Sequence, residues 1–288
     1  MHPDTLSVIL RSASFVALFQ AAGMALFLGL FGRLLEASKE PISTIARASA
    51  FAAAILLLAQ YALEAARMAD DMAGILDPSL QMMAMHSASS TVLIVRLSAL
   101  ALIVIGVGRG GDIANIASVI GVALVASSFS LTGHTVANPM RWAMAPLLIS
   151  HVMIVTFWFG ALLPLYLVST RESSAIAGRV TAAFSRLAGW LVPAIFAAGF
   201  LLGAFLVRHL AEFRLPYGLS LLGKAGGFAV LMGFAAFNKW RLGPAMASGN
   251  RQAVRVFRCS LVLEYVLITA VLTVTAAMTT FYSPDSKD

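Results

Sequence analysis

Long apolar stretches recur along the whole chain, and they constrain its fold more than any other feature. Each consists mostly of Ala, Leu, Val and Phe with scattered Gly. We find eight: 7–32, 45–68, 90–108, 113–131, 145–168, 184–207, 218–238 and 257–281. A helix needs roughly 20 such residues to cross about 30 Å of bilayer hydrocarbon. The sequence therefore predicts an all-α, polytopic membrane bundle of about eight transmembrane helices.

The composition excludes most other classes of protein. Of 288 residues, 60% are hydrophobic and 11% are charged, and the mean hydropathy is +0.88. Soluble domains are about 25% charged. A soluble enzyme, a disordered chain and a nucleic-acid binder are therefore excluded, and the lipid bilayer is the expected surrounding. The net charge of +7 is assigned to loop cations that orient the protein in the membrane.

These cations are distributed unequally between alternate connections. One set holds twelve: Arg33, Lys39, Arg47, Arg109, Arg171, Arg179, Arg186, Lys239, Arg241, Arg251, Arg255 and Arg258. The other set holds five: Arg67, Arg141, Arg208, Arg214 and Lys287. Because cations accumulate on the cytoplasmic side, both termini are expected outside. The first span lacks a cationic leader and is expected to be retained. We divide the chain into two four-span halves, 1–131 and 132–288.

Methionine and histidine gather on the outer side of this topology. All five histidines and nine of the 13 methionines map there. The densest group is Met82, Met83, Met85 and His86, in a predicted outer loop. Thioether and imidazole ligands suit copper(I), so this loop is a candidate metal site. The alternative is that the methionines are flexible apolar filler.

The fifth span contains a second candidate. Met144, His151 and Trp158 recur every seven residues and are expected to share one helical stripe. A histidine inside a membrane span indicates function, although a structural hydrogen bond would also explain it. His134 precedes this span in an outer loop, which is expected to lie above His151. Gly160 is expected to permit close helix approach.

Ionisable residues also occur inside other spans. Lys224 and Glu264 lie in the seventh and eighth spans, at depths that would allow their long side chains to meet. Two interpretations remain open: a structural ion pair, or a role in gating or proton-linked transport. Arg11 and Arg96 are expected to extend to the outer face.

A series of short motifs runs through the second half of the chain: Gly133-His134, His151-x6-Trp158-x-Gly160-x-Leu162, Phe184-Ser185-Arg186-Leu187, Tyr217-Gly218-x2-Leu221-x2-Lys224, Asn238, Pro244, Arg258-x5-Glu264, Thr279-Thr280 and Pro284. In these positions the chain resembles the CopD-type copper resistance and copper uptake membrane proteins. The resemblance covers about residues 130–284, whereas the first half agrees only in its hydropathic plan. Ala161 departs from the Trp-x-Gly-Gly of many relatives.

This resemblance implies a bacterial inner-membrane protein that moves copper inward from the periplasm, with a small periplasmic copper-binding partner. His134 and His151 match the family's histidines. On this interpretation the protein is not an enzyme, copper is its cargo, and Trp158, Lys224 and Glu264 line or gate the path.

Two other functions stay open on the sequence. One is a b-type haem electron carrier, in which His151 would need a second ligand such as His86 or His134. The other is an assembly protein that holds copper at the outer face without transporting it. No phosphate-binding loop of the GxxxxGK[ST] type occurs, which argues against ATP-driven transport.

Overall fold

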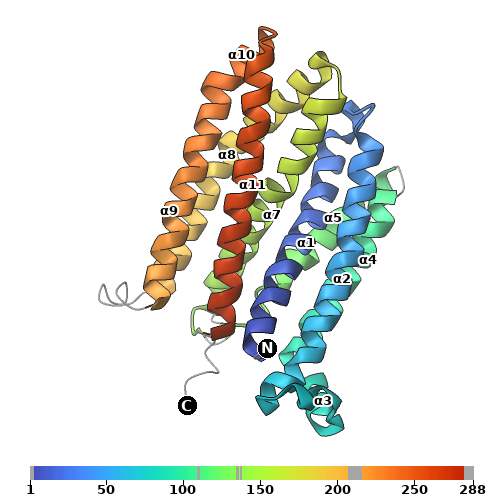
Figure 1. Cartoon of the computed structure of the whole chain (residues 1–288), viewed down its shortest axis with the longest axis vertical. Coiled ribbons are helices and arrows are strands. Elements are labelled where there is room, and N and C mark those ends of the chain that lie inside the picture. Colours follow the sequence, from blue (N-terminus) through green and yellow to red (C-terminus); the bar gives the residue numbers. More distant parts are fainter. Residues whose placement is uncertain (1–2, 109–110, 134–135, 137, 207–215, 282–288) are drawn as a thin grey trace.

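The structure is a computed structural model, and it describes residues 3–108, 111–133, 136, 138–206 and 216–281. Over these residues all regular secondary structure is helical. The long helices run side by side as one bundle (Figure 1). They are α1 (Pro3–Phe31), α2 (Lys39–Ala69), α4 (Ala88–Gly108), α5 (Asp112–Ser128), α7 (Arg141–Arg171), α8 (Ser174–Leu206), α9 (Pro216–Phe237) and α11 (Arg251–Phe281).

Short helical turns connect or extend the long helices at both ends of the bundle. They are η1 (Gly32–Leu34), η2 (Met72–Leu76), α3 (Pro78–Met85), the π-helical η4 (Asn238–Leu242) and α10 (Gly243–Ala247). Figure 1 places α3 at one end of the bundle and α10 at the other.

Seven of the predicted spans are confirmed as helices that are long and apolar enough to cross a membrane. The protein is therefore a multi-pass membrane protein. The predicted span at 113–131 is also an apolar helix, α5, but it has only 17 residues. Its length is close to the lower limit of about 17 residues for a membrane-spanning helix.

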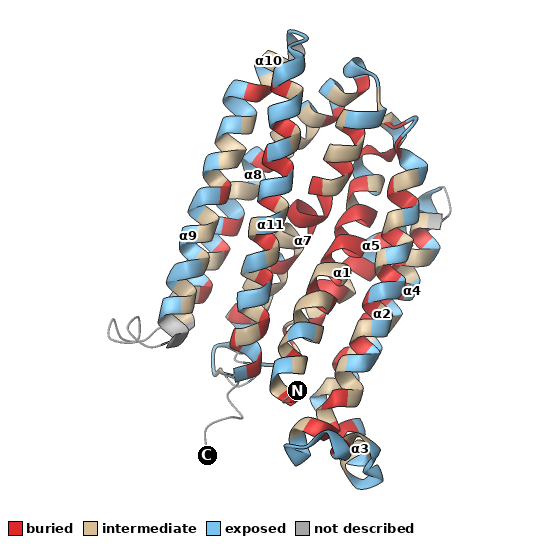
Figure 2. Cartoon of the chain, viewed as in Figure 1, coloured by how far each residue is buried: buried red, intermediate tan, exposed pale blue. Residues whose placement is uncertain are grey.

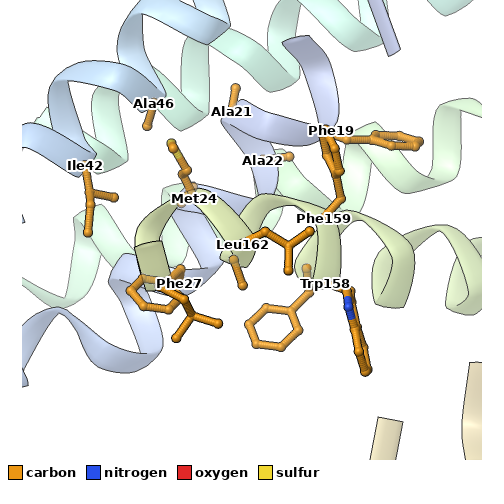
Figure 3. Packing of buried hydrophobic residues seen from close by; sticks show 14 of the residues in the cluster. Phe19, Ala21, Ala22, Met24, Phe27, Ile42, Ala46, Trp158, Phe159 and Leu162 are labelled. Atoms are coloured by element: carbon orange, nitrogen blue, oxygen red, sulfur yellow. The ribbon is translucent and has the colours of Figure 1, made fainter. Parts of the chain in front are cut away.

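The core of the bundle lies around α1 and α7. Phe27, Leu18 and Phe159 have no exposed surface, and neighbouring residues of both helices interdigitate with them (Figure 3). Gly160 of α7 packs directly on Gly23 of α1, so the predicted close approach is confirmed. Figure 2 shows buried residues concentrated on α1 and α7, whereas α9 is largely exposed. The bundle thus has a tightly packed centre and a loosely covered α8–α9 side.

The two predicted halves share one core, because α1 packs on both α7 and α11. The first and last long helices are also linked near their ends. The guanidinium of Arg11 donates to the backbone carbonyl of Thr279 at 2.9 Å. The start of α1 and the end of α11 therefore lie at the same end of the bundle (Figure 1).

Candidate functional site

Helix α7 positions the predicted stripe of Met144, His151 and Trp158. Met144 is 1% exposed and Trp158 is 6% exposed, whereas His151 is half-buried. Two turns of helix separate neighbouring members of the stripe by about 10 Å. The three side chains therefore lie at successive depths of the bundle and do not form one compact site.

His151 faces helix α8. A Cβ at position 199 would lie 3.5 Å from Cε1 of the imidazole ring, so the absence of a side chain at Gly199 leaves room for the ring. The ring also contacts the backbone of Ile195. Its Nδ1 atom is buried and has no hydrogen-bond partner. Among the described residues, this imidazole nitrogen therefore has no hydrogen-bond partner and is available to bind a metal ion.

Lys224 of α9 does not meet Glu264. Its positive charge acts on the imidazole, and it forms no ion pair with Glu264. The predicted ion pair between Lys224 and Glu264 is therefore wrong. The reason is the register of α9: the residue that meets Glu264 is Asn238, 14 residues and about 21 Å further along the helix.

Glu264 forms a second polar site at the junction of α7, α11 and the end of α9. Glu264 is 2% exposed. It accepts hydrogen bonds from Nδ2 of Asn238 at 2.7 Å and from the hydroxyl of Ser260 at 3.3 Å. The Trp158 side chain adds a further polar contact. Two residues that the sequence proposed for the transport path, Trp158 and Glu264, therefore meet.

Asn238 and Ser260 were not among the predicted site residues. Asn238 is the first residue of the π-helical turn η4, and its Oδ1 atom is buried without a partner. In the sequence, Asn238 lies at the end of an apolar span and is followed by Lys239. This pattern is typical of an ordinary helix end and gives no sign of a functional site. Ser260 lies four residues before Glu264, so helical spacing was the signal that pointed to it.

The Met-rich segment is a short helix and not a loop. Met82, Met85 and His86 have the spacing that places residues on one face of α3 and its cap, and all three are exposed. Met83 is exposed as well. However, α3 packs mainly on α2, η2 and α4, whereas His151 faces α8. The Met-rich segment therefore does not lie beside His151, and His134 falls outside the described residues.

The ligand chemistry available to a metal is limited. Among the residues that the structure describes, no three His, Cys, Asp or Glu side chains come together as a metal site. A copper site among these residues would therefore need thioethers to complete its ligands. The packing of α3 away from α7 also leaves His86 and His151 apart, so these two described histidines do not form a pair of haem ligands.

Arg96 is another departure from the sequence prediction. It is 7% exposed and donates from Nε to the Ser128 hydroxyl at 3.0 Å. Its guanidinium lies 4.5 Å from the ring centroid of Phe129 and 6.0 Å from that of Phe15. The cation is held inside the bundle by these contacts and does not extend to the outer face.

Comparisons with known proteins agree with the resemblance and extend it to the first half of the chain. Residues 178–278 match a family described as Copper resistance protein D, and residues 1–142 match one described as Copper resistance protein D-like, N-terminal domain. The restriction of the resemblance to residues 130–284 is thus corrected. His151 and Trp158 lie between the two matched segments.

A curated relative supports the same assignment. Copper resistance protein D of Pseudomonas syringae pv. tomato is 27% identical over 289 residues, which cover 91% of this chain and 91% of that protein. No solved structure matches the chain. With both halves of the chain matched, this protein belongs to the CopD-type family of copper resistance membrane proteins.

Proposed function

We propose that the protein carries copper across the bacterial inner membrane, from the periplasm to the cytoplasm. Its family relates it to copper, and its seven long apolar helices make it a multi-pass membrane protein. The observation that carries the proposal is the free, buried Nδ1 atom of His151. A buried polar atom without a partner is unfavourable unless something binds it, and imidazole nitrogen is a good copper ligand.

Lys224 makes this binding weak, which suits transport. Its positive charge acts on His151 and opposes a second cation at the same place. An ion that crosses a membrane needs sites that accept it and then release it. His151 is therefore proposed as a transient ligand, with Met144 before it and Trp158 after it along α7.

The exposed face of α3 is proposed as the place where copper is first collected. Met82, Met85 and His86 supply two thioethers and an imidazole on one face, and Met83 is exposed beside them. Thioether ligands favour copper(I). A small periplasmic copper-binding protein is the proposed donor at this surface. Since α3 packs away from α7, copper would pass from this face to His151 in a separate step.

Eight membrane crossings with both ends outside complete the proposal. The Arg11–Thr279 hydrogen bond holds the beginning of α1 beside the end of α11. Two ends on the same side require an even number of crossings, so α5 is proposed to cross with the seven longer helices. The cation-rich connections then face the cytoplasm, as the positive-inside rule requires.

Replacement of His151 tests the proposal directly. His151→Ala is expected to abolish copper accumulation in cells and in proteoliposomes while the protein still inserts at the wild-type level. Ser150→Ala, at the exposed neighbouring position, is the matched control and should accumulate copper normally. The measurement is copper content per amount of inserted protein. Wild-type accumulation by His151→Ala would refute the role of His151. A wild-type protein that binds copper but does not move it would refute transport.

A further inference from the structure

Glu264 is a carboxyl group buried in the bundle, and no cation of the described part of the chain pairs with it. It lies 13 residues after Arg251, the first residue of α11, which places it about 20 Å along the helix. The ion pairs found among the described residues do not include it. A carboxylate removed from water is unfavourable unless it is well compensated, so its surroundings are informative about its function.

All three polar partners of Glu264 are neutral. They are Asn238, Ser260 and Trp158, contributed by the end of α9, by α11 and by α7. Neutral hydrogen bonds compensate only part of the cost of burying a charge. The site therefore stabilises neither the charged nor the protonated form of Glu264 strongly. A group that exchanges a proton requires this balance.

Asn238 can serve Glu264 in both protonation states. Its Nδ2 now donates to the carboxylate at 2.7 Å, while its Oδ1 is buried and unpaired. An amide has donors on one side and an acceptor on the other. After rotation of the amide, Oδ1 would accept the O–H of a protonated Glu264. Asn238 also begins a π-helical turn, a distortion found frequently at functional sites.

The charged groups on the elements around Glu264 are exposed or make contacts elsewhere. On α11, Arg258 donates to Ser169, and Arg251 and Arg255 are exposed. Lys224 of α9 lies 14 residues before Asn238, the residue that meets Glu264. On η4, the Lys239 ammonium lies near the position where Gly189 would carry a Cβ, and Arg241 is exposed.

The described residues of the remaining elements place no charge against the carboxylate either. On α7, Arg141 and Arg171 lie at the two ends of the helix, and His151 faces α8. The Arg11 guanidinium of α1 binds Thr279 near the other end of α11. Tyr265, the titratable residue next to Glu264, stacks on Phe159 with ring centroids 4.6 Å apart.

The ligand set also indicates which ion Glu264 handles. Carboxylate, amide and hydroxyl oxygens are hard ligands, whereas copper(I) prefers sulfur and imidazole nitrogen. The ligands proposed for copper lie elsewhere, on α3 and at Met144 and His151 of α7. The oxygen site is therefore suited to a proton and not to the metal.

We propose that Glu264 takes up and releases one proton in each transport cycle, with Asn238 as its partner in both states. This inference rests on the proposed copper transport. The carboxylate oxygen gains a proton from water at one membrane face, and the new O–H donates to Asn238. The O–H bond then breaks, and the proton leaves to water at the other face. No electrons are exchanged.

Proteoliposomes that contain the purified full chain and an internal pH-sensitive dye test this proposal. Copper(I), kept reduced with ascorbate, is added outside, and internal copper and internal pH are followed together. Wild type should show a copper-dependent change of internal pH. Glu264→Gln, which retains the side-chain shape but cannot titrate, should lose this pH change. It should also lose the dependence of copper uptake on external pH.

Two further variants separate titration from structure. Glu264→Asp keeps a titratable carboxyl group and should retain part of the pH signal. Glu40→Gln, at an exposed acid on α2, is the matched control and should behave as wild type.

The outcomes distinguish this inference from the proposed function. A wild-type protein that moves copper without protons, or a Glu264→Gln variant with the wild-type pH signal, would overturn the role of Glu264 and leave copper transport intact. A wild-type protein that moves no copper would overturn the proposed function itself.

Discussion

Gly23 of α1 and Gly160 of α7 face one another where the two central helices cross. A Cβ on Gly23 would lie 2.6 Å from Cα of Gly160, and a Cβ on Gly160 would lie 2.7 Å from the carbonyl carbon of Gly23. Neither position has room for even a methyl side chain. Inside a membrane, helices are held together largely by such close packing, because lipid removes the hydrophobic driving force between them. The adjacent Trp158 and Phe159 are positioned by this contact.

Gly160→Ala is therefore expected to destabilise the bundle. Overpacking of a well-packed core costs about 1–3 kcal/mol. The variant should show a lower melting temperature in detergent and a lower folded yield. Gly29→Ala on α1 is the matched control, since a Cβ there meets nothing within 4 Å. Equal melting temperatures for Gly160→Ala and wild type would contradict the close contact.

Glu172 is expected to make stability depend on pH at the end of the bundle where α7 ends. Its Oε1 accepts backbone N–H bonds from Glu36, Ala37 and Ser38 at 3.1, 3.0 and 2.9 Å, and a further bond from the Ser38 hydroxyl. Burial alone would raise the pKa of the Glu172 carboxyl, but these bonds outweigh it and hold the pKa below its ordinary value. The charged form is thus the one that the folded state favours.

The sign of the pH effect follows from this lowered pKa. The stabilisation is fully present above the unfolded value of about 4.3 and is lost as the pH falls through the lower folded value. Glu172→Gln should therefore melt below wild type at pH 7, and the difference should shrink below about pH 4.3. Thermal unfolding across pH measures it. A difference that does not change with pH would show that the Glu172 charge has no role.

Lys224→Met is expected to strengthen copper binding and slow copper release. The substitution removes the positive charge that acts on His151 and opposes the incoming cation. The measurements are copper affinity of the purified protein, by competition with a chelator, and copper efflux from proteoliposomes. Lys239→Met, at an exposed cation of η4 just after α9, is the control. Unchanged affinity would exclude Lys224 from the site.

The same residue also tests the correction of the predicted ion pair. Because Lys224 and Glu264 do not interact, the stability effects of Lys224→Met and Glu264→Gln should add within about 0.5 kcal/mol in the double variant. A double variant much more stable than this sum would show that Lys224 and Glu264 do interact.

Replacing the exposed thioethers of α3 should weaken copper collection alone. The Met82→Leu, Met85→Leu double variant keeps the apolar volume but removes two soft ligands. Copper uptake should fall at low external copper and recover at high copper, as expected for a collecting surface. Leu80→Met on the same helix is a control that leaves these ligands in place. Loss of uptake at every copper concentration would instead place both residues on the transport path.

Reporter fusions test the orientation. Fusions at Lys39 and Ser248 should report the cytoplasm, and a fusion near Asp77 should report the outer compartment. The reason is the excess of cations in the connections that contain Lys39 and Ser248. A cytoplasmic signal near Asp77 would reverse the proposed direction of entry.

The sequence by itself determined that this is a membrane protein, where its helices lie, and which metal-binding and ionisable side chains they carry. Hydropathy belongs to each segment by itself, so the spans were predictable without knowing their neighbours. The same holds for the imidazole of His151 inside α7 and for the ionisable Glu264 inside α11. The short α5 marks the limit of this reasoning, since hydropathy predicted 113–131 but the helix ends at Ser128.

The tertiary structure decided which of these residues meet. Helix rotation and register gave Glu264 the neutral Asn238 in place of Lys224, and put the charge of Lys224 where it acts on His151. They also buried Arg96 against Phe129 and directed α3 away from α7. These relations depend on how side chains of different helices pack, as at Gly23 and Gly160, and helix packing depends on residues far apart in the sequence.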